Sequence, residues 1–386
     1  FHNVLCLSEA KGMDIKMINI NKEDCCFCEA CINVCPTKAI VSMKDECGYK
    51  YPKIELDKCI NCNQCEKVCQ IGKGYPTKDT EKVLAARVKN EDIYQKSASG
   101  GMASIITQHI LEKNGIVYGC AYTDSGFAHI RISSEKEWER LAGSKYVQSS
   151  LGMIYKDIKK DLDEGQKVLF VGLPCQIVGI KMYLRKEYEN LYTIDLICHG
   201  VGQQDFLWEE FPRNRMIEIS FRDEKGFNLT IKTDKKIFKK PSYLSYYYKG
   251  FLGGLLYREN CYFCKFAKPE RVGDITLGDF WGLDKENIYF STNKGVSVVM
   301  INTSKGSALF DEIAEDIFYQ EETLENAMKH NGQLNHPSKK HPMRKKFIKL
   351  CKNNGYLYAI KKCYKNEILK STVKYYIKKV ILRWSK

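Results

Sequence analysis

The organisation of this chain follows from two stretches, CCFCEACINVCP (Cys25 to Pro36) and CINCNQCEKVC (Cys59 to Cys69). Each stretch spaces four cysteines as CxxCxxCxxxC. The first three cysteines of such a motif lie on one tight loop and converge on a cubane iron–sulfur cluster, whereas the fourth serves the other cluster. The spacing therefore predicts a bacterial-type ferredoxin segment with two 4Fe-4S clusters, one held by Cys25, Cys28, Cys31 and Cys69 and the other by Cys59, Cys62, Cys65 and Cys35.

Two other uses of cysteine fit these motifs less well. Zinc knuckles bring two CxxC pairs to one tetrahedral ion, and three cysteines in a row suit that geometry poorly. Neighbouring cysteines this close cannot all reach the geometry of a disulfide. The segment departs from the usual ferredoxin pattern where Phe27 replaces a common glycine and where Gln70 replaces the proline after the last cysteine. Both changes affect the surroundings of a cluster more than its ligands.

The length of 386 residues predicts two or three domains. We place a ferredoxin-type domain at 17–75, a second domain at 80–335 and a basic helical tail at 336–386, with a Gly- and Pro-containing linker at 70–80. Cysteines at metal spacing, no recognisable signal peptide and no apolar run of about twenty residues predict a cytoplasmic protein without a membrane span.

The positive charge of the chain is concentrated at its end. The formal net charge is +14, and residues 339–386 carry sixteen Lys and Arg against the single acid Glu367, which leaves a balance of −1 for residues 1–338. Between Tyr356 and Trp384, apolar residues recur at near-helical spacing with lysines between them. A basic amphipathic helix favours peripheral contact with an anionic membrane, and a helix that packs on the body is the alternative. We expect no nucleic-acid partner, although charge alone would permit one.

The second domain alternates strands and helices. Apolar runs predict strands at 82–88, 115–122, 129–134, 167–171, 191–196 and 296–302, helices at 102–113 and 174–187, and a polar hairpin or meander at 216–239. The strand, helix and strand between 167 and 202 form a βαβ unit, which requires a parallel pair. The fold class is therefore α+β, with the ferredoxin domain followed by an α/β domain that has a largely parallel sheet.

Two polar loops of this domain are candidates for binding an anion. Ser97, Ser99, Gly100 and Gly101 form a small-residue turn before the helix that begins at Met102. Free N–H groups at the positive end of a helix suit a phosphate, and a plain N-cap is the alternative. Lys145, in the loop GSKYVQSS (Gly143 to Ser150), could neutralise an anion or be an ordinary solvated lysine.

Four further cysteines have a spacing or position suited to a metal. Cys175 and Cys198 end consecutive strands of the βαβ unit, so their loops should open at one edge of the sheet. Cys261 and Cys264 form a CxxC pair, which one metal commonly holds. Together they supply the four ligands of a third 4Fe-4S cluster. A zinc site, a redox-active CxxC and buried thiols without metal remain alternatives, and Cys6, Cys47, Cys120, Cys351 and Cys363 stay unassigned.

Behind the ferredoxin segment, six motifs follow in a fixed order: SASGG, GSKYVQSS, LFVGLPCQ, DLICHGV, CYFCKFA and DITLGDFWG. Over about residues 20–310 the chain thereby resembles the beta-subunit family of coenzyme F420 hydrogenases and dehydrogenases. The resemblance implies that the domain after the linker binds FAD and exchanges electrons between it and the clusters. It also implies flavin or substrate contacts at Ser97, Ser99, Gly100, Gly101, Lys145, Gly172 and Pro174.

These observations lead to two hypotheses about function. The first is an iron–sulfur flavoprotein oxidoreductase whose organic hydride donor or acceptor is F420, a similar deazaflavin or another reducible molecule. The second is a non-catalytic electron-transfer subunit that delivers electrons to a partner enzyme. Both hypotheses need a redox partner, and the sequence assigns no catalytic residue.

Overall fold

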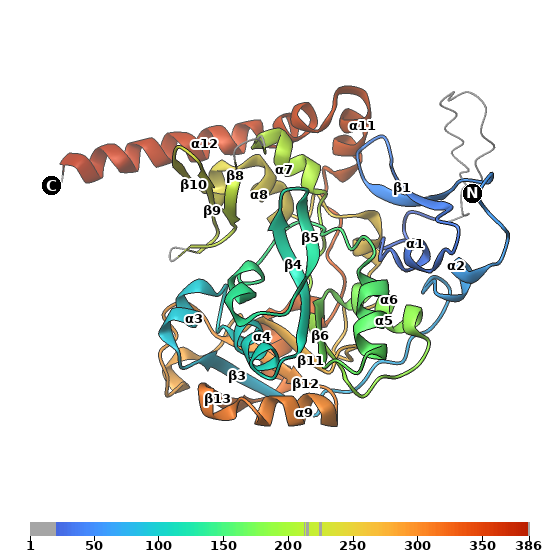
Figure 1. The fold of residues 1–386 in the computed structure, drawn as a ribbon. Coiled ribbons are helices and arrows are strands. Elements are labelled where there is room, and N and C mark those ends of the chain that lie inside the picture. Colours follow the sequence, from blue (N-terminus) through green and yellow to red (C-terminus); the bar gives the residue numbers. More distant parts are fainter. Residues whose placement is uncertain (1–20, 212, 214–215, 224–225, 385–386) are drawn as a thin grey trace.

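A large mixed sheet forms the centre of the molecule, with its eight strands in the order β13-β3-β12-β11-β7-β6-β4-β5 (Figure 1). The computed structural model describes residues 21–211, 213, 216–223 and 226–384. The strands are β1 (Ile40–Lys44), β2 (Lys50–Ile54), β3 (Lys82–Val88), β4 (Ile116–Thr123), β5 (Gly126–Ile132), β6 (Val168–Gly172), β7 (Leu191–Leu196), β8 (Met216–Ser220), β9 (Asn228–Thr233), β10 (Ile237–Pro241), β11 (Ile275–Asp279), β12 (Ser297–Ile301) and β13 (Ile317–Glu322). The helices are α1 (Ala30–Val34), α2 (Gln64–Lys67), α3 (Glu91–Lys96), α4 (Met102–Glu112), α5 (Ile154–Asp163), α6 (Pro174–Leu184), α7 (Gln204–Glu210), α8 (Tyr246–Leu252), α9 (Ser304–Asp311), α10 (Leu324–His330), α11 (Arg344–Asn354) and α12 (Tyr356–Trp384).

The sheet is parallel at its centre and antiparallel towards its edges. Strands β4, β6, β7 and β11 pair in parallel, which confirms the predicted βαβ unit β6-α6-β7. Strand β12 runs antiparallel between β11 and β3, and β13 and β5 close the two edges antiparallel. The sequence did not predict these reversals, because a strand buried on both faces has the same apolar composition in either direction.

Helices cover both faces of the sheet, and this explains why most residues of its central strands are buried. On one face α4 and α9 pack through Ile106, Ile110 and Phe310. On the other face α5 and α6 pack through side chains that include Ile158 and Ile177. Since every residue of β12 is buried, neither face of the sheet meets solvent there.

The ferredoxin segment consists of two similar loops joined by the hairpin β1-β2. Phe27 and Asn61 occupy equivalent places in the two motifs and adopt positive φ angles of 55° and 54°. The next equivalent pair, Glu29 and Asn63, has φ angles of 60° and 55° and precedes α1 and α2. The doubled cysteine motif is therefore also a doubled backbone conformation.

A second hydrophobic core lies beside the sheet and includes part of the basic tail. Strands β8, β9 and β10 form the predicted meander, of which residues 224–225 lie outside the described part. Phe206 of α7, Tyr247 of α8, Phe347 of α11 and Tyr356 of α12 are all buried in this core. The first half of α12 thus packs on the body, while its second half extends away from it (Figure 1). Among the described helices, none is long and apolar enough to cross a membrane.

Candidate functional site

The four cysteines predicted to hold the first cluster lie together. Burial raises the pKa of the Cys25 thiol to about 11, and its thiol neighbours are Cys28 and Cys69. Burial also raises the pKa of Cys31, and the charges of the Cys28, Cys25, Cys69 and Cys65 thiols raise it further. Three cysteines of the first motif therefore meet the last cysteine of the second, which is the crossed arrangement that the spacing predicts.

The other four ferredoxin cysteines form a more exposed group. Cys59 and Cys65 pack against the small core of Cys35, Ala39 and Ile40, in which the Cys35 sulfur accepts a hydrogen bond from the Ala39 N–H at 3.2 Å. Cys62 neighbours Cys65 and is exposed to solvent. We call Cys35, Cys59, Cys62 and Cys65 the outer cysteine group.

The two departures from the ferredoxin pattern are both contacts with the large domain. Phe27 is buried, and the guanidinium carbon of Arg258 lies 5.5 Å from its ring centroid. The Gln70 amide donates a hydrogen bond of 3.0 Å to the carbonyl oxygen of Cys175. A glycine at position 27 or a proline at position 70 would lack the side chain that makes the contact. The segment therefore differs from free ferredoxins where it meets the sheet domain.

The structure brings together the four cysteines that lie outside the ferredoxin segment. Cys175 follows β6 and Cys198 follows β7, and these parallel neighbours end at the same edge of the sheet. Cys261 lies in the 3-10 helix Glu259–Phe263, and Cys264 follows it. The charge of each of the other three thiols acts on the pKa of Cys175. We call them the inner cysteine group.

The inner cysteine group lines one small cavity at the carboxyl edge of the sheet. Its wall consists of Cys26, Leu173, Pro174, Cys175, Cys198, His199, Gly200, Val201, Asn260, Cys261, Cys264, Phe266, Ala267, Pro337 and Ser338. Burial raises the pKa of Cys198, and the Gly200 N–H lowers it. Burial likewise raises the pKa of Cys264, and the Phe266 N–H lowers it. N–H groups aimed at cysteine sulfur stabilise the thiolate that a metal requires, so the donor set fits an iron–sulfur cluster.

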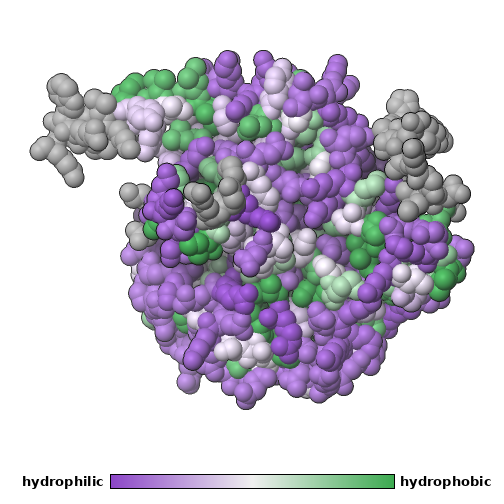
Figure 2. Space-filling view, turned by 45° about the horizontal axis from the view of Figure 1, so that its top comes forward, coloured by the Kyte–Doolittle hydropathy of each residue, from purple (hydrophilic) through white to green (hydrophobic). Residues whose placement is uncertain are grey.

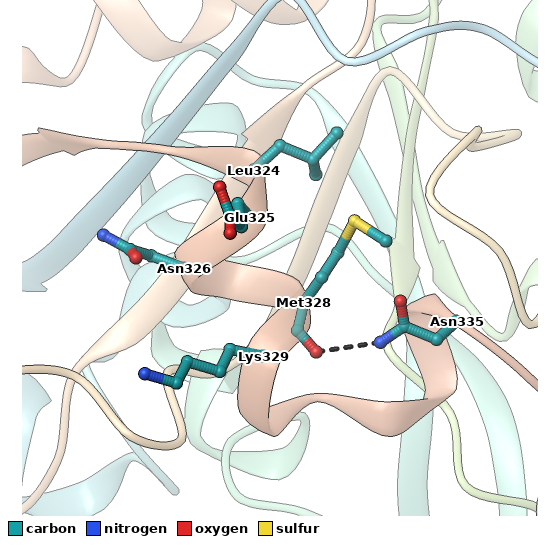
Figure 3. Close-up of a pocket in the computed structure, with 6 residues that line it drawn as sticks. All are labelled: Leu324, Glu325, Asn326, Met328, Lys329 and Asn335. Carbon is teal, nitrogen blue, oxygen red and sulfur yellow. Dashed lines mark hydrogen bonds between the residues drawn. The ribbon is translucent and has the colours of Figure 1, made fainter.

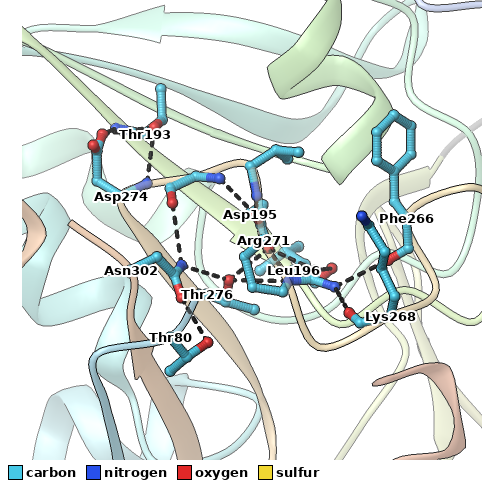
Figure 4. A network of polar contacts seen from close by, with 12 residues as sticks. Thr80, Thr193, Asp195, Leu196, Phe266, Lys268, Arg271, Asp274, Thr276 and Asn302 are labelled. Atoms are coloured by element: carbon cyan, nitrogen blue, oxygen red, sulfur yellow. Dashed lines mark hydrogen bonds and ion pairs between the residues drawn. The ribbon is translucent and has the colours of Figure 1, made fainter. Parts of the chain in front are cut away.

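A buried ion pair holds the segment after Cys264 against the sheet (Figure 4). The Arg271 guanidinium lies 2.7 Å from the Asp195 carboxylate of β7, and both side chains are almost fully buried. Arg271 also donates to the carbonyl oxygens of Phe266 and Lys268 at 3.1 Å. The position of the CxxC segment is thereby fixed relative to β7, the strand that leads to Cys198.

A fifth thiol, which the spacing excluded as a ligand, lies between the inner group and the first cluster group. The Cys26 side chain interacts with the thiols of both Cys175 and Cys28. The contact with Cys175 and burial raise the pKa of Cys26, whereas the contact with Cys28 lowers it. In the described part of the chain, no set of three His, Cys, Asp or Glu side chains is placed to hold a single metal ion. A cubane cluster spreads its four thiolates over four irons, so this observation concerns single ions only.

The SASGG turn packs tightly on the sheet. The Ser97 hydroxyl donates to the Ile93 carbonyl at 2.7 Å, and that of Ser99 donates to the Val296 carbonyl at 3.0 Å. A Cβ atom at Gly100 would lie 2.2 Å from the Ala86 carbonyl oxygen of β3. Gly101 has a φ of +83° and is the N-cap of α4. The side chains are thus engaged within the protein, and backbone N–H groups at the start of α4 are what this turn can offer a phosphate.

Lys145 is turned inwards rather than solvated. Its ammonium donates hydrogen bonds of 2.7 Å to the carbonyl oxygens of Leu141 and Ala142. Burial lowers the pKa of Lys145 to about 8, and the charge of the Cys120 thiol acts in the opposite direction. A cation with neutral hydrogen-bond partners suits the role of neutralising an anion, as the sequence suggested.

The sequence did not reveal Arg222, which joins three of the six motifs. It donates to the Ala98 carbonyl of SASGG at 3.1 Å and to the Tyr146 hydroxyl of GSKYVQSS. Its guanidinium also pairs with the Asp279 carboxylate of DITLGDFWG, with one bond of 3.0 Å. Arg222 follows β8, so the meander reaches over the edge of the sheet. Nothing in the sequence distinguishes this arginine from the other charged residues of the polar meander, so these contacts could not be predicted.

The loop after β6 is fixed by a chain of hydrogen bonds. The Gln176 side chain accepts from the Leu173 N–H at 2.8 Å and donates to the Ser149 hydroxyl at 3.3 Å. Ser149 lies 3.0 Å from His129 Nδ1, and His129 Nε2 lies 3.1 Å from the Val171 carbonyl. Burial lowers the pKa of His129 to about 4, so the ring is neutral at pH 7. Of the two contacts predicted here, Pro174 lines the cavity and Gly172 does not.

A second hollow lies apart from these groups, on α10 (Figure 3). Leu324, Glu325, Asn326, Met328, Lys329 and Asn335 line it, and the Asn335 amide donates to the Met328 carbonyl at 2.9 Å. It contains none of the predicted site residues, so the candidate site is the carboxyl edge of the sheet.

The motifs of this edge match known protein families. Residues 83–155 match the model of the N-terminal part, and residues 165–327 that of the C-terminal part, of the coenzyme F420 hydrogenase/dehydrogenase beta subunit. Residues 18–41 match a 4Fe-4S binding domain.

Two curated relatives show the same likeness at low identity. The chain is 22% identical over 219 residues to a subunit of the F(420)H(2) dehydrogenase of Methanosarcina mazei, and the match covers 53% of this chain and 61% of the relative. It is 24% identical over 308 residues to the coenzyme F420-dependent sulfite reductase of Methanocaldococcus jannaschii, and this match covers 74% of this chain and 45% of the relative. The chain therefore spans about half to three fifths of these relatives.

A solved structure is also similar. A chain of the F420-reducing nickel–iron hydrogenase complex of Methanosarcina barkeri aligns with a TM-score of 0.44 at 14% identity, over 69% of this chain and 97% of that chain.

Proposed function

Because this chain belongs to the coenzyme F420 hydrogenase/dehydrogenase beta subunit family and carries a 4Fe-4S binding segment, we propose that it is an iron–sulfur flavoprotein oxidoreductase. It would exchange a hydride with an organic partner, F420 or another reducible molecule, at FAD, and single electrons through its clusters. When bound, FAD supplies the conversion between two-electron and one-electron chemistry. The proposed domains are those drawn from the sequence, at 17–75, 80–335 and 336–386.

The observation that carries this proposal is the continuity of the cysteine groups. The inner group lies at the carboxyl edge of the sheet, where sheets of this kind bind ligands. Cys26 joins it to the group of Cys25, Cys28, Cys31 and Cys69, and the outer group follows. We propose a 4Fe-4S cluster at each group, so that electrons would pass from the sheet edge to the protein surface.

The residues around the edge have separate roles in this proposal. The Lys145 ammonium, held by backbone carbonyls, would neutralise an anionic group of the flavin or the substrate. Arg222 keeps the SASGG turn and the DITLGDFWG turn at one place. Ser97, Ser99, Gly100, Gly101, Gly172 and Pro174 would shape the flavin pocket through backbone and packing.

An electron-transfer subunit is the second candidate, since one curated relative is named as a subunit of a dehydrogenase. Anaerobic reconstitution followed by iron, sulfide and flavin analysis separates the two. We expect about twelve irons, the number that three cubane clusters hold, and a fluorescent flavin in the supernatant after denaturation. Reduced F420 should then bleach the cluster absorption of the purified chain. A chain that holds iron but no flavin, even after incubation with FAD, would contradict the flavoprotein proposal and favour the electron-transfer subunit.

We propose in addition that the projecting half of α12 touches an anionic membrane surface. Leu369, Val373, Tyr376 and Ile377 are each more than half exposed, and Lys370 and Lys374 lie among them. Their spacing places these apolar residues on one face of the helix. Figure 2 displays this apolar surface along the described end of α12. Basic helices with such a face bind at the boundary between water and lipid.

A further inference from the structure

Arg258 is a fully buried arginine (0% exposed) just before the 3-10 helix Glu259–Phe263 that carries Cys261. Its guanidinium donates to the Lys50 carbonyl at 2.9 Å, to the Gln148 side-chain oxygen at 3.1 Å and to the Cys25 carbonyl at 3.2 Å. Among the residues that the structure describes, its Nε finds no hydrogen-bond partner. All of these acceptors are neutral, so the hydrogen bonds do not balance the charge.

Other buried arginines of the chain are paired with acids, and Arg258 differs from them. Arg271 lies 2.7 Å from Asp195, and Arg344 lies 3.6 Å from Glu259. Within the described residues, no carboxylate lies within ion-pair distance of Arg258. Glu29 is near enough for the charge to act on it, but its carboxylate accepts from the N–H groups of Leu151 and Gly152 instead.

Arg258 contacts cysteines of two groups. Its guanidinium donates to the Cys25 carbonyl at 3.2 Å, and the Cys261 N–H donates to the Arg258 carbonyl oxygen at 3.1 Å. Cys25 belongs to the first ferredoxin group and Cys261 to the inner group. A buried cation is costly unless an opposite charge lies near it, and cysteine-held clusters are such charges.

We propose that Arg258 is the buried countercharge of the cluster held by Cys25, Cys28, Cys31 and Cys69, and that it raises the reduction potential of this cluster. The inference rests on the proposed function, since it requires clusters at the cysteine groups. On reduction the cluster accepts one electron and becomes more negative, and a fixed cation inside the protein stabilises that form. Gln148 holds the guanidinium in place, which gives the glutamine of GSKYVQSS a role.

The test is a redox titration with dithionite, followed by electron paramagnetic resonance, on the reconstituted full-length chain. Arg258→Gln removes the charge, and Arg258→Lys retains it. Gln148→Glu leaves Arg258 in place but sets a carboxylate beside it and so cancels the charge. Arg344→Gln is the matched control, because it removes a buried arginine that lies against Tyr49 rather than against Cys25.

We expect Arg258→Gln and Gln148→Glu each to make reduction of this cluster at least tenfold less favourable, a shift of about 59 mV for one electron. Arg258→Lys and Arg344→Gln should stay near the wild-type potential. If the Arg258→Gln variant loses its iron, the reduction potential of the Gln148→Glu variant alone tests the proposal. Unchanged potentials in both charge variants, with normal iron content, would overturn the countercharge and leave the proposed function intact. A wild-type chain that binds no iron would overturn both.

Discussion

The thiol of Cys26, in the first cysteine motif, lies against the thiol of Cys175 at the end of β6. These residues are far apart in the chain and belong to different predicted domains. Their contact joins the ferredoxin segment to the sheet edge, because one side chain separates Cys28 from the inner cysteine group.

Of these two neighbours, only Cys175 should be needed for the full iron content. Cys26→Ser should leave the iron content unchanged, because Cys26 is off the ligand spacing and a hydroxyl can replace its contacts. Cys175→Ser should lose about four of about twelve irons, the content of one cubane cluster. Iron and sulfide analysis of the two anaerobically reconstituted variants measures this difference. Equal losses in both would mean that Cys26 is itself a ligand.

The Asp195 and Arg271 pair should be essential for stability. Asp195→Asn leaves a buried guanidinium without its countercharge, which costs about 3–5 kcal/mol in the free energy of unfolding. Urea denaturation followed by tryptophan fluorescence measures the loss. Asp163→Asn, at the exposed pair with Lys159, is the control and should change little. A similar midpoint for both variants would contradict the structural role of the pair.

His129 should make the protein less stable in mild acid. Burial holds its folded pKa near 4, below the ordinary value of 6.5, so the unfolded chain binds a proton first as the pH falls. Its contribution to stability is complete above pH 6.5 and is lost as the pH falls towards 4. Between pH 7.5 and 5.5 the expected loss is about 1.4 kcal/mol. Denaturation at the two pH values should show a smaller difference for His129→Gln than for wild type, whereas the exposed His336→Gln should match wild type.

The projecting half of α12 should bind anionic vesicles. Replacing Leu369, Val373 and Tyr376 together by Ser should abolish cosedimentation with vesicles that contain phosphatidylserine at low salt, because the apolar face is lost. Ile217→Ser with Ile237→Ser, on the exposed meander, is the matched control. Undiminished binding of the α12 variant would refute the membrane contact and favour a protein partner.

Truncation experiments on this helix need a cut beyond the hydrophobic core. Arg344, Phe347, Tyr356 and Ile360 are buried, so removal of the whole basic tail from Lys339 would expose the core. Ending the chain after Ser371 removes most of the projecting half only. We expect this shorter chain to keep its iron and flavin content, as measured after anaerobic purification, and to lose vesicle binding.

The sequence predicted those parts of the site that depend on spacing. The crossed grouping of Cys25, Cys28, Cys31 and Cys69 follows from loop geometry that the motif itself dictates. The meeting of Cys175 and Cys198 follows from the βαβ rule, since parallel neighbours end at one edge. Both predictions depend on local geometry, which a short cysteine motif or a single βαβ unit determines.

The contacts that could not be predicted from the sequence join residues that are far apart in the chain. Arg258 reaches Cys25 and Arg222 reaches Asp279 only because the whole sheet has formed. Lys145 belongs to a residue type that is usually solvated, and its inward direction depends on two carbonyl groups of the preceding turn. Amino-acid composition does not indicate whether a side chain points inwards. It also does not indicate whether a buried strand such as β12 runs parallel or antiparallel to its neighbours.

The exposure of the outer cysteine group predicts the order in which dioxygen would damage the clusters. Cys62 is open to solvent, and its neighbour Ile60 is among the most exposed apolar side chains, whereas Cys25 is buried and Cys198 is only partly exposed. With clusters at all three groups, dioxygen would reach the outer one first. We expect damage to proceed from the surface inwards, so that a briefly aerated sample would lose the iron of the outer group before that of the inner group.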